Sequence, residues 1–471
     1  MHLVRSITRL SATRPFPLSR RHQLWTAATS AHPDLATALR QCFPASAPSD
    51  VSSGTTTVTP SAGTKDSSVT IILASRSYPG SDLLSLPSKA PVHVSQSSTV
   101  LAAVVDRVPT KSGHGVSTLT ISPTAPLNHK PVISCKAFFL SGADSRRKRL
   151  KEKSVGRWAR TQDLEERSLD SPEAWADFKS ISIGQNQVQV PEAAFPIVPL
   201  DSNLAQQQDI FMISDLEVHQ FLEALDTVNP EATKLGLVAS STPFITGRPV
   251  TMFYEGKLVE DGVLGVTITT ESGKIPEKTR VEYPSMAPLG PAMQITRCRG
   301  NIILELDESN ATRLLLDQLQ ATTLTKDKEY FLATTSDPSG VTLSAEKPAI
   351  DMNRAMVYKI TGGDPSKGNM AVDTVHDLQV GQWVQFIHHN QVQESGHFHS
   401  STTSETMRFT ASDPNKMIEE QESNPEQEAE KINAAVEKVF GGSSENGFVV
   451  GLPNRNTWVC DVTDSVLTHD P

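Results

Sequence analysis

The hydrophobic pattern of the first third of the chain alternates between short apolar runs and one amphipathic segment. Residues 69–74 and 100–105 are continuous apolar runs rich in β-branched side chains, which predicts buried strands. Residues 116–121 alternate between apolar and polar side chains, which predicts a half-buried strand. Leu35, Leu39 and Phe43 recur at four-residue spacing between Asp34 and Pro44, which predicts a short helix.

The centre of the chain predicts a strand–helix–strand unit. Residues 210–213 form an apolar strand, and residues 235–239 return as a second one. Between them, Ser214 and Glu217 have the spacing of a capping box, and apolar side chains then recur at helical spacing. Turns at Glu255-Gly256 and Asp261-Gly262 predict an antiparallel meander over residues 250–268.

The second half predicts a hairpin, a helix and isolated strands. The hairpin joins residues 294–298 to residues 301–306, and a helix with an apolar face follows over residues 311–319. Strands are expected at residues 383–387, 448–450 and 458–460. Proline cannot donate a ladder hydrogen bond, so the proline-rich stretch 284–291 is expected to connect two parts. The fold class is therefore α+β, in two parts, with mixed and largely antiparallel sheets and flanking helices.

Three segments lack this periodicity. Residues 44–68 consist mostly of small and polar side chains, residues 141–208 combine a basic run with an acidic stretch, and residues 411–430 are rich in glutamate. We expect all three to be surface insertions, with 44–68 and 411–430 mobile. The basic run 146–153 is either a partner- or nucleic-acid-binding patch or, as its acidic neighbours favour, a solvated helix.

Composition narrows the function classes. The 471 residues have a net charge of −10, which argues against a dedicated nucleic-acid-binding protein. No apolar run reaches the roughly 18–20 residues of a membrane-spanning helix, so no integral membrane association is expected. Four isolated cysteines exclude a disulfide scaffold and zinc sites of the paired-cysteine type.

The first thirty residues have the composition of a mitochondrial transit peptide. Five arginines and no acidic residue precede Asp34, and a helix would separate Leu3, Ile7 and Leu10 from Arg5 and Arg9. We therefore expect residues 1–30 to direct the protein to the mitochondrial matrix. The alternative is a cytoplasmic protein with a disordered N-terminal tail.

Other clusters point only weakly to chemistry. His388, His389, His397 and His399 lie within twelve residues, which suits a metal, but no further ligand has a diagnostic spacing. The glycines at 362, 363 and 368 lack the Gly-Lys-Ser/Thr ending of a phosphate loop. Cys298 lies between two arginines that point to the other face of an alternating strand. The sequence predicts no metal site, no cofactor and no catalytic residue.

Residues 210–268 resemble the FIST N-terminal domain. The resemblance rests on an apolar strand ending in Ser-Asp, a helix, a glycine-containing strand, a Gly-Arg-Pro turn at 247–249 and an Asp-Gly before Val-Leu-Gly-Val. Residues 100–117 and 380–386 are also similar to the family. Residues 288–319 look like the junction into a FIST C-terminal domain. The expected organisation is a FIST N-terminal domain over 31–275 and a FIST C-terminal domain over 276–471.

This resemblance implies a non-catalytic sensory module for signal transduction that binds a small molecule, such as an amino acid-like ligand. In some eukaryotes a FIST pair follows an F-box and recruits ubiquitin-ligase substrates, but residues 1–40 resemble no F-box. The alternatives are a protein-recruitment scaffold with a protein partner and an unrecognised hydrolase or transferase.

Pockets carry a few convergent polar groups, and polar residues at the carboxyl end of a strand face such crevices. We therefore expect ligand-binding residues at the ends of the strand–helix–strand unit and of the hairpin. The candidates are Ser240, Ser241, Thr242, Arg248, Arg297 and Asn301. The competing interpretation is that these side chains cap turns or form surface ion pairs.

Overall fold

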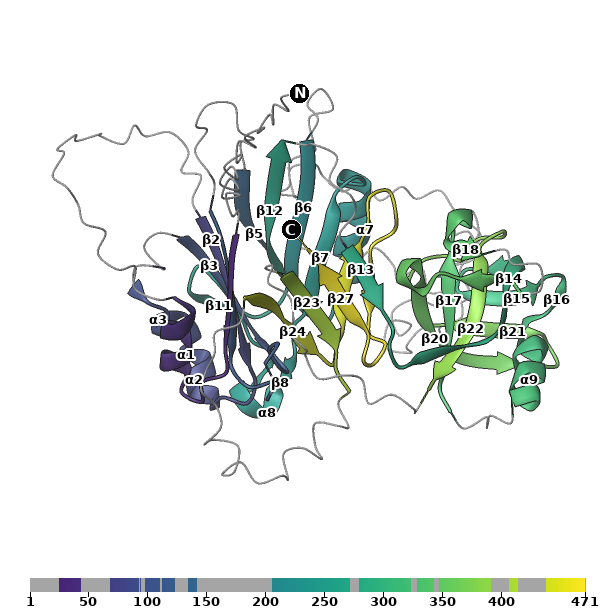
Figure 1. The fold of residues 1–471 in the computed structure, drawn as a ribbon, viewed down its shortest axis with the longest axis horizontal. Coiled ribbons are helices and arrows are strands. Elements are labelled where there is room, and N and C mark those ends of the chain that lie inside the picture. Colours follow the sequence, from purple (N-terminus) through teal and green to yellow (C-terminus); the bar gives the residue numbers. More distant parts are fainter. Residues whose placement is uncertain are drawn as a thin grey trace, which may run out of the picture.

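The structure is a computed structural model of the whole chain. It describes residues 25–43, 68–92, 94, 98–110, 112–122, 134–141, 206–271, 279–322, 328–342, 347–390, 406–413 and 438–470. Most of the predicted insertions 44–68, 141–208 and 411–430 lies outside the described residues, as do His397 and His399. Residues 206–208 of the second insertion begin strand β6 (Gln206–Ser214). The fold is mainly β, and it combines mixed sheets with a six-stranded antiparallel barrel (Figure 1).

The first sheet contains the N-terminal strands and a short hairpin from the centre of the chain. Its order is β1 (Trp25–Ser30), β4 (Val116–Ile121), β2 (Ser68–Ser75), β3 (Ser98–Val105), β10 (Met252–Tyr254) and β11 (Lys257–Val259). Strands β2 and β3 are parallel, and the other pairs are antiparallel. The strands predicted at 69–74, 100–105 and 116–121 are thereby confirmed.

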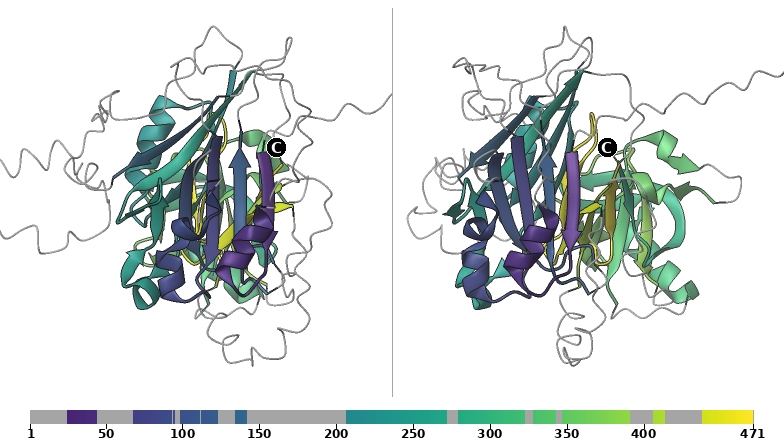
Figure 2. Two further views of the ribbon diagram at one scale, coloured as in Figure 1. Left: turned by 90° about the vertical axis from the view of Figure 1, so that its left-hand side faces the viewer. Right: turned by 60° about the vertical axis from the view of Figure 1, so that its left-hand side comes forward.

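Three short helices cover the outer face of this sheet (Figure 2, left). They are α1 (Leu35–Cys42), α2 (Gly80–Leu84) and α3 (Leu86–Lys89). The predicted helix at residues 34–43 is confirmed, because Asp34 caps it by accepting a 2.7 Å hydrogen bond from the backbone N–H of Thr37. Leu35 and Leu39 of its apolar face are completely buried against the sheet.

The second sheet contains the predicted strand–helix–strand unit. Its order is β26 (Trp458–Cys460), β25 (Phe448–Gly451), β7 (Thr233–Val238), β6 (Gln206–Ser214), β12 (Val263–Glu271) and β5 (Ser134–Leu140). Strands β6 and β7 are parallel, and α7 (His219–Val228) joins them and packs on one face of the sheet.

The predicted capping box at Ser214 and Glu217 is wrong. Helix α7 begins only at His219, after Val218, whose side chain makes no capping hydrogen bond. The Asp215 carboxylate instead accepts the backbone N–H groups of Glu217 at 2.9 Å and of Gly262 at 2.7 Å. Because this carboxylate ties the end of β6 to the turn before β12, the chain makes an extra turn before the helix starts.

The third sheet consists of strands from the end of the chain and one from its middle. Its order is β13 (Thr279–Glu282), β27 (Val466–His469), β23 (Thr406–Ala411) and β24 (Val439–Ser444). Strands β23 and β24 are parallel. Phe409 and Phe440 of this sheet lie with ring centroids 5.6 Å from that of Phe211 in β6, so the second and third sheets share one core.

The fourth sheet closes into the barrel, which lies to one side of the other sheets (green, right in Figure 1). Its strands are β14 (Met286–Arg299), β22 (Trp383–His389), β17 (Tyr330–Thr335), β20 (Met356–Asp364), β21 (Asn369–Val372) and β15 (Ile302–Leu306), extended by β16 (Ser309–Asn310). Pairing of β14 with β15 completes the closure. Helix α9 (Ala311–Thr322) packs beside it, and the hairpin and helix predicted here are confirmed.

Smaller elements complete the fold. They are the two-stranded ladders β8 (Ser241–Thr242) with β9 (Arg248–Val250) and β18 (Val341–Thr342) with β19 (Ala349–Ile350), the helix α8 (Pro243–Thr246), and the 3-10 turns η3 (Pro338–Gly340) and η4 (Met352–Arg354). No helix within the described ranges has the length and apolar character needed to cross a membrane.

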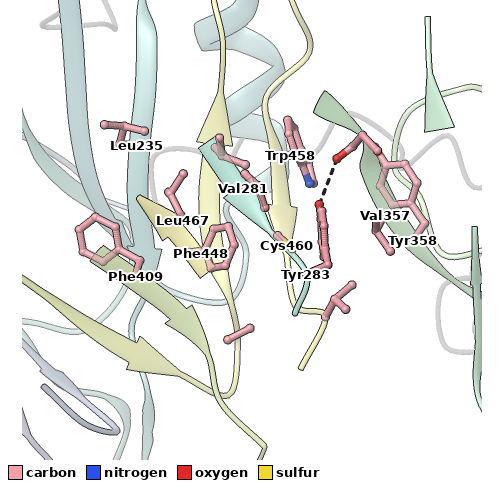
Figure 3. Packing of buried hydrophobic residues seen from close by; sticks show 14 of the residues in the cluster. Leu235, Val281, Tyr283, Val357, Tyr358, Phe409, Phe448, Trp458, Cys460 and Leu467 are labelled. Atoms are coloured by element: carbon pink, nitrogen blue, oxygen red, sulfur yellow. Dashed lines mark hydrogen bonds between the residues drawn. The ribbon is translucent and has the colours of Figure 1, made fainter. Parts of the chain in front are cut away.

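A buried cluster joins the barrel to the remaining sheets. Figure 3 shows Tyr283, Trp458 and Cys460 packed towards Val357 and Tyr358 of the barrel strand β20. The Tyr283 hydroxyl donates a 3.0 Å hydrogen bond to the carbonyl oxygen of Ala355. The α+β class predicted from the sequence thus gives way to a mainly β architecture, because the strands predicted in the second half close on themselves rather than alternate with helices.

The sequence predicts a FIST N-terminal domain over residues 31–275 and a FIST C-terminal domain over residues 276–471. This division stays a prediction. In space, the chain leaves the first two sheets after β12, forms the barrel over residues 286–389, and then returns. Strand β25 pairs with β7, and β24 leads to an isolated bridge between Ser443 and Arg107. The last third of the chain therefore completes sheets that the first half begins.

Candidate functional site: the strand-end cluster

Five strands end at one place in the molecule. Strand β2 is followed by Arg76, β3 by Asp106, β7 by Ser240 after one residue, β23 by Ser412 and β24 by Glu445. These five residues are named the strand-end cluster. In open α/β sheets the carboxyl ends of parallel strands face the crevice where ligands bind.

Backbone hydrogen bonds hold the strand ends together. The N–H of Arg76 donates to the Val105 carbonyl at 2.7 Å, and the N–H of Asp106 donates to the Ser443 carbonyl at 2.9 Å. The N–H of Ser240 donates to the carbonyl of Val104 at 3.2 Å. The first, second and third sheets therefore contribute to one rigid junction.

A guanidinium and two carboxyl groups lie at the centre of the cluster. Arg76 Nη1 is 3.0 Å from Asp106 Oδ1 and 4.0 Å from Glu445 Oε2. The Ser412 hydroxyl donates to Asp106 Oδ2, and the N–H of Ser241 donates to Glu445 Oε1 at 2.7 Å. The Asp106 side chain is completely buried, whereas the side chains of Arg76 and Glu445 are 21% and 14% exposed. Solvent therefore reaches parts of Arg76 and Glu445 but not the Asp106 side chain.

Burial separates the two carboxyl groups in acidity. Burial raises the pKa of Asp106 to about 7, the charge of Glu445 adds to this rise, and the Arg76 guanidinium opposes it. Burial also acts to raise the pKa of Glu445, but hydrogen bonds from Asp106 and Ser241 outweigh it and leave that pKa lowered. The proton held between the two groups therefore resides on Asp106, and the negative charge resides on Glu445.

Several buried polar atoms around the cluster have no hydrogen-bond partner. They are the hydroxyl oxygens of Ser240 and Ser443, the Oδ1 atom of Asp106 and the Oε2 atom of Glu445. Ser240 is completely buried and Ser443 is 3% exposed. Buried polar groups are hydrogen-bonded in the great majority of cases, so each exception calls for an explanation. A ligand with polar groups would satisfy them.

A serine and a histidine lie beside the cluster. Ser77 follows Arg76, and its hydroxyl is hydrogen-bonded to His114 Nδ1 and to the Ser75 hydroxyl. Burial lowers the pKa of His114, so its imidazole is neutral at neutral pH. The backbone N–H of Gly115 donates to Ser75 Oγ at 3.2 Å. This chain of hydrogen bonds holds the loop after β2 against the loop before β4.

The structure places two of the six predicted ligand residues in the strand-end region. Ser240 belongs to the cluster, and Ser241 donates its N–H to Glu445. Thr242 is completely buried, and its hydroxyl lies 2.7 Å from that of Thr251. Arg248 lies beyond α8, with a side chain 36% exposed and an ion pair of 3.0 Å to Glu260.

The other two predicted residues lie on the barrel. Arg297 is 65% exposed and pairs with Glu305 at 3.1 Å, beside a shallow surface pocket of about 190 Å³ that both residues line. Asn301 donates from Nδ2 to the Val372 carbonyl at 3.0 Å. The positive φ of the hairpin turn falls on Gly300, at 59°, and not on Asn301. The six candidates therefore do not form one site, and their role in binding stays a prediction.

The other candidate groups are placed as follows. His388 lies in β22, and its Nδ1 atom is 2.9 Å from the carbonyl oxygen of His389. Cys298 is half-buried, its thiol donates to the Leu378 carbonyl, and burial raises its pKa. Among the residues that the structure describes, no three histidine, cysteine, aspartate or glutamate side chains are grouped to hold a metal ion.

Sequence reasoning missed Arg76, Asp106 and Glu445. Arg76 and Asp106 directly follow the apolar strands β2 and β3, which is the pattern that selected Ser240. Glu445 follows β24, whose sequence Val-Phe-Gly-Gly-Ser-Ser is not an apolar run. The pattern alone does not reveal that β3 and β24 end side by side, because the bridged residues Arg107 and Ser443 lie far apart in the sequence.

Comparison with known proteins gives one family. The model described as FIST N domain matches residues 24–309, and no family model matches a FIST C-terminal domain. No curated protein matches the sequence. The crystal structure of TrmO from Pseudomonas aeruginosa is similar over 30% of this chain and 73% of that chain, with 11% identity and a TM-score of 0.13. A TM-score this low contributes nothing to the assignment.

Proposed function

Because the chain belongs to the FIST N domain family, we propose that it is a non-catalytic sensory module that binds a small molecule at the strand-end cluster. The observation that carries this proposal is the group of buried polar atoms without partners. The hydroxyls of Ser240 and Ser443 and one oxygen of Glu445 lie where three sheets meet. A core that gained nothing from them would replace them with apolar side chains, since unsatisfied buried polar groups cost about 1–3 kcal/mol each.

The experiment is mass spectrometry of small molecules released from the natively purified full chain. We compare the wild type with Arg76→Leu and with Arg248→Leu as a matched control. Both arginines form one ion pair near 3.0 Å, and both are partly exposed. The proposal expects a co-purifying compound that is lost from the Arg76 variant and retained by the Arg248 variant.

The reverse result would move the ligand site to the turn that contains Arg248, as the sequence predicts, and would refute the assignment to the strand-end cluster. Absence of any bound compound from all three proteins would refute the binding proposal itself. Thermal melting of each variant is the check on its folding.

A recruitment scaffold is the second candidate. The observation that favours it is Phe244 in α8, whose side chain is fully exposed four residues after Ser240. Aromatic side chains are enriched at protein–protein interfaces. A protein that co-purifies in place of a small molecule, and is lost on Phe244→Ser, would favour this candidate.

We also propose a location in the mitochondrial matrix. The support is the arginine-rich, acid-free composition of the first 30 residues. Residues 25–30 form β1, which pairs with β4. A presequence that is cleaved would therefore end before Trp25, since loss of β1 would expose the edge of β4.

A further inference from the structure

We propose that Ser77 is a nucleophile that accepts one acyl group from an activated donor, an ester or thioester with a good leaving group, and that His114 is its general base. This inference goes beyond the proposed function. It adds a covalent modification site beside the strand-end cluster and does not depend on what that cluster binds. It rests on the direction of the hydrogen bonds that join Ser75, Ser77 and His114, and on the exposure of Ser77.

Burial fixes the direction of these hydrogen bonds. Ser75 is completely buried, and its hydroxyl has two partners, the N–H of Gly115 at 3.2 Å and the hydroxyl of Ser77. An N–H group only donates, so the hydroxyl hydrogen of Ser75 goes to Ser77 Oγ. The hydroxyl hydrogen of Ser77 then goes to His114 Nδ1. The imidazole is therefore placed to accept the proton that a serine loses when it acts as a nucleophile.

The fold holds His114 in this orientation. Gly113 and Gly115 on either side of it have positive φ, 70° and 133°. A Cβ atom on Gly115 would lie 2.0 Å from the carbonyl oxygen of Ser30. The buried ring of Tyr78 packs against the imidazole, with their centroids 4.4 Å apart. The sequence Gly-His-Gly is thus required for the position of the imidazole beside Ser77.

The imidazole is neutral at neutral pH. Burial lowers the pKa of His114 below its usual value of 6.5, the Pro33 carbonyl opposes this effect, and the charge of His32 adds to it. A neutral imidazole has one accepting nitrogen. Since that nitrogen is Nδ1, the ring proton is on Nε2, which is buried. The basic nitrogen therefore faces the exposed serine, and the protonated nitrogen lies away from solvent.

The reaction uses the serine, the base and an incoming donor. Ser77 is exposed, so a donor reaches Oγ without entering a cavity. Oγ forms a bond to the acyl carbon while its proton passes to His114 Nδ1. The bond from the acyl carbon to the leaving thiolate or alkoxide breaks, and this group departs with the electron pair and takes the proton from His114. In the described part of the chain the backbone N–H of Ser77 donates no hydrogen bond, so it is available to the developing oxyanion.

The product is an ordinary serine ester. It is less reactive than the activated donor, so the acyl group stays on Ser77 and the modification is stoichiometric. A sensory module modified in this way needs no turnover, which is consistent with a non-catalytic protein.

The test is the reaction of the full chain with p-nitrophenyl acetate. We expect a rapid release of one equivalent of p-nitrophenolate per chain, and peptide mass spectrometry should locate one acetyl group on Ser77. The rapid phase should disappear in Ser77→Ala. Its rate constant should fall about 100-fold or more in His114→Asn, because a positioned general base contributes roughly 10²–10⁴-fold.

Ser366→Ala is the matched control. Ser366 is also exposed, and its hydroxyl donates to Asp364 Oδ1 at 2.6 Å. Hydrogen bonds from Ser366 lower the pKa of Asp364, so this carboxylate is a weak base. The variant should therefore react as the wild type does. Thermal melting checks the folding of each variant.

The outcomes decide the proposal. Absence of a rapid phase in the wild type, its persistence in Ser77→Ala, equal acetylation of Ser77 and Ser366, or an unchanged rate in His114→Asn would each overturn it. If Ser77→Ala does not fold, the peptide map of the wild type and the rate of His114→Asn decide. Release that continues beyond one equivalent and is lost in Ser77→Ala would support the nucleophile and refute the non-catalytic part of the proposed function.

Discussion

Replacement of Asp106 by Asn is the sharpest test of the electrostatics of the strand-end cluster. The carboxyl group of Asp106 is completely buried between β3 and β24, with Arg76 on one oxygen and the Ser412 hydroxyl on the other. Asn has nearly the same shape and retains a carbonyl oxygen, but it is neutral at every pH. The substitution therefore removes one titration and little volume.

The magnitude follows from linkage. The pKa of Asp106 is raised from 3.8 to about 7, so the folded state binds the proton more tightly than the unfolded state. A carboxyl group with a raised pKa stabilises the fold fully below its unfolded pKa, and this contribution is lost as the pH rises through its folded pKa. A shift of this size corresponds to a loss of roughly 4 kcal/mol in the free energy of unfolding between about pH 4 and pH 7. The lowered pKa of Glu445 acts in the opposite direction and reduces the net slope.

The assay is urea denaturation of the wild type and of Asp106→Asn at about pH 5 and about pH 8. The wild type is expected to be less stable at the higher pH, and the variant is expected to lose this dependence. Asp337→Asn is the control: hydrogen bonds from Ser339 lower the pKa of Asp337, so this carboxylate is ionised in the folded and unfolded states at both pH values, and its replacement should leave the pH dependence unchanged. If Asp106→Asn is destabilised more at the higher pH than at the lower one, ionised Asp106 stabilises the fold through Arg76 and our reasoning is refuted.

Two further predictions concern the core and the N-terminus. Lys234 is completely buried, and its Nζ atom lies 3.0 Å from Asp226 Oδ1. Asp226→Asn should therefore lower the free energy of unfolding by about 3–5 kcal/mol in urea denaturation, and Lys234→Met should lower it clearly less because it removes the buried charge. Equal losses would contradict this. A fluorescent protein fused after residues 1–40 should enter mitochondria and be cleaved before Trp25, whereas a cytosolic fusion would contradict the targeting proposal.

The local elements could be predicted from the sequence because their causes are local. The apolar runs at 69–74 and 100–105 became β2 and β3, and the four-residue spacing after Asp34 became α1. The turn at Glu255-Gly256 has positive φ at both residues, 50° and 75°, as a tight hairpin between β10 and β11 requires. Each of these depends on contacts within a few residues.

The barrel could not be predicted in this way. Its closure depends on the pairing of β14 with β22 at one edge and with β15 at the other. The alternation of apolar and polar side chains over residues 294–306 predicts strands, but it does not indicate that the long strand β14 pairs with two partners. The same limit applies to Ser214. Its spacing to Glu217 fits a capping box, but the Asp215 carboxylate accepts the backbone N–H of Glu217 instead and also binds the distant Gly262.

The candidate site was only half predictable for the same reason. Ser240 was found because it follows an apolar strand, but the same rule, applied to the hairpin, selected Arg297 and Asn301 on the barrel. The strand-end cluster forms because strands from the beginning of the chain end beside strands from its end. This arrangement depends on the complete fold and cannot be derived from local sequence patterns.

The composition of the cluster also bears on how far the family match extends. The matched region ends at residue 309, and it contains Arg76, Asp106 and Ser240. Ser412 and Glu445 directly follow β23 and β24, which come after the barrel strands in the sequence. Without these strands, Asp106 would lose the hydroxyl bond of Ser412, and Phe211 would lose both aromatic partners in the shared core. The ligand site that we propose therefore requires β23 and β24. The region that matches the family model does not contain them, so it cannot form the whole site.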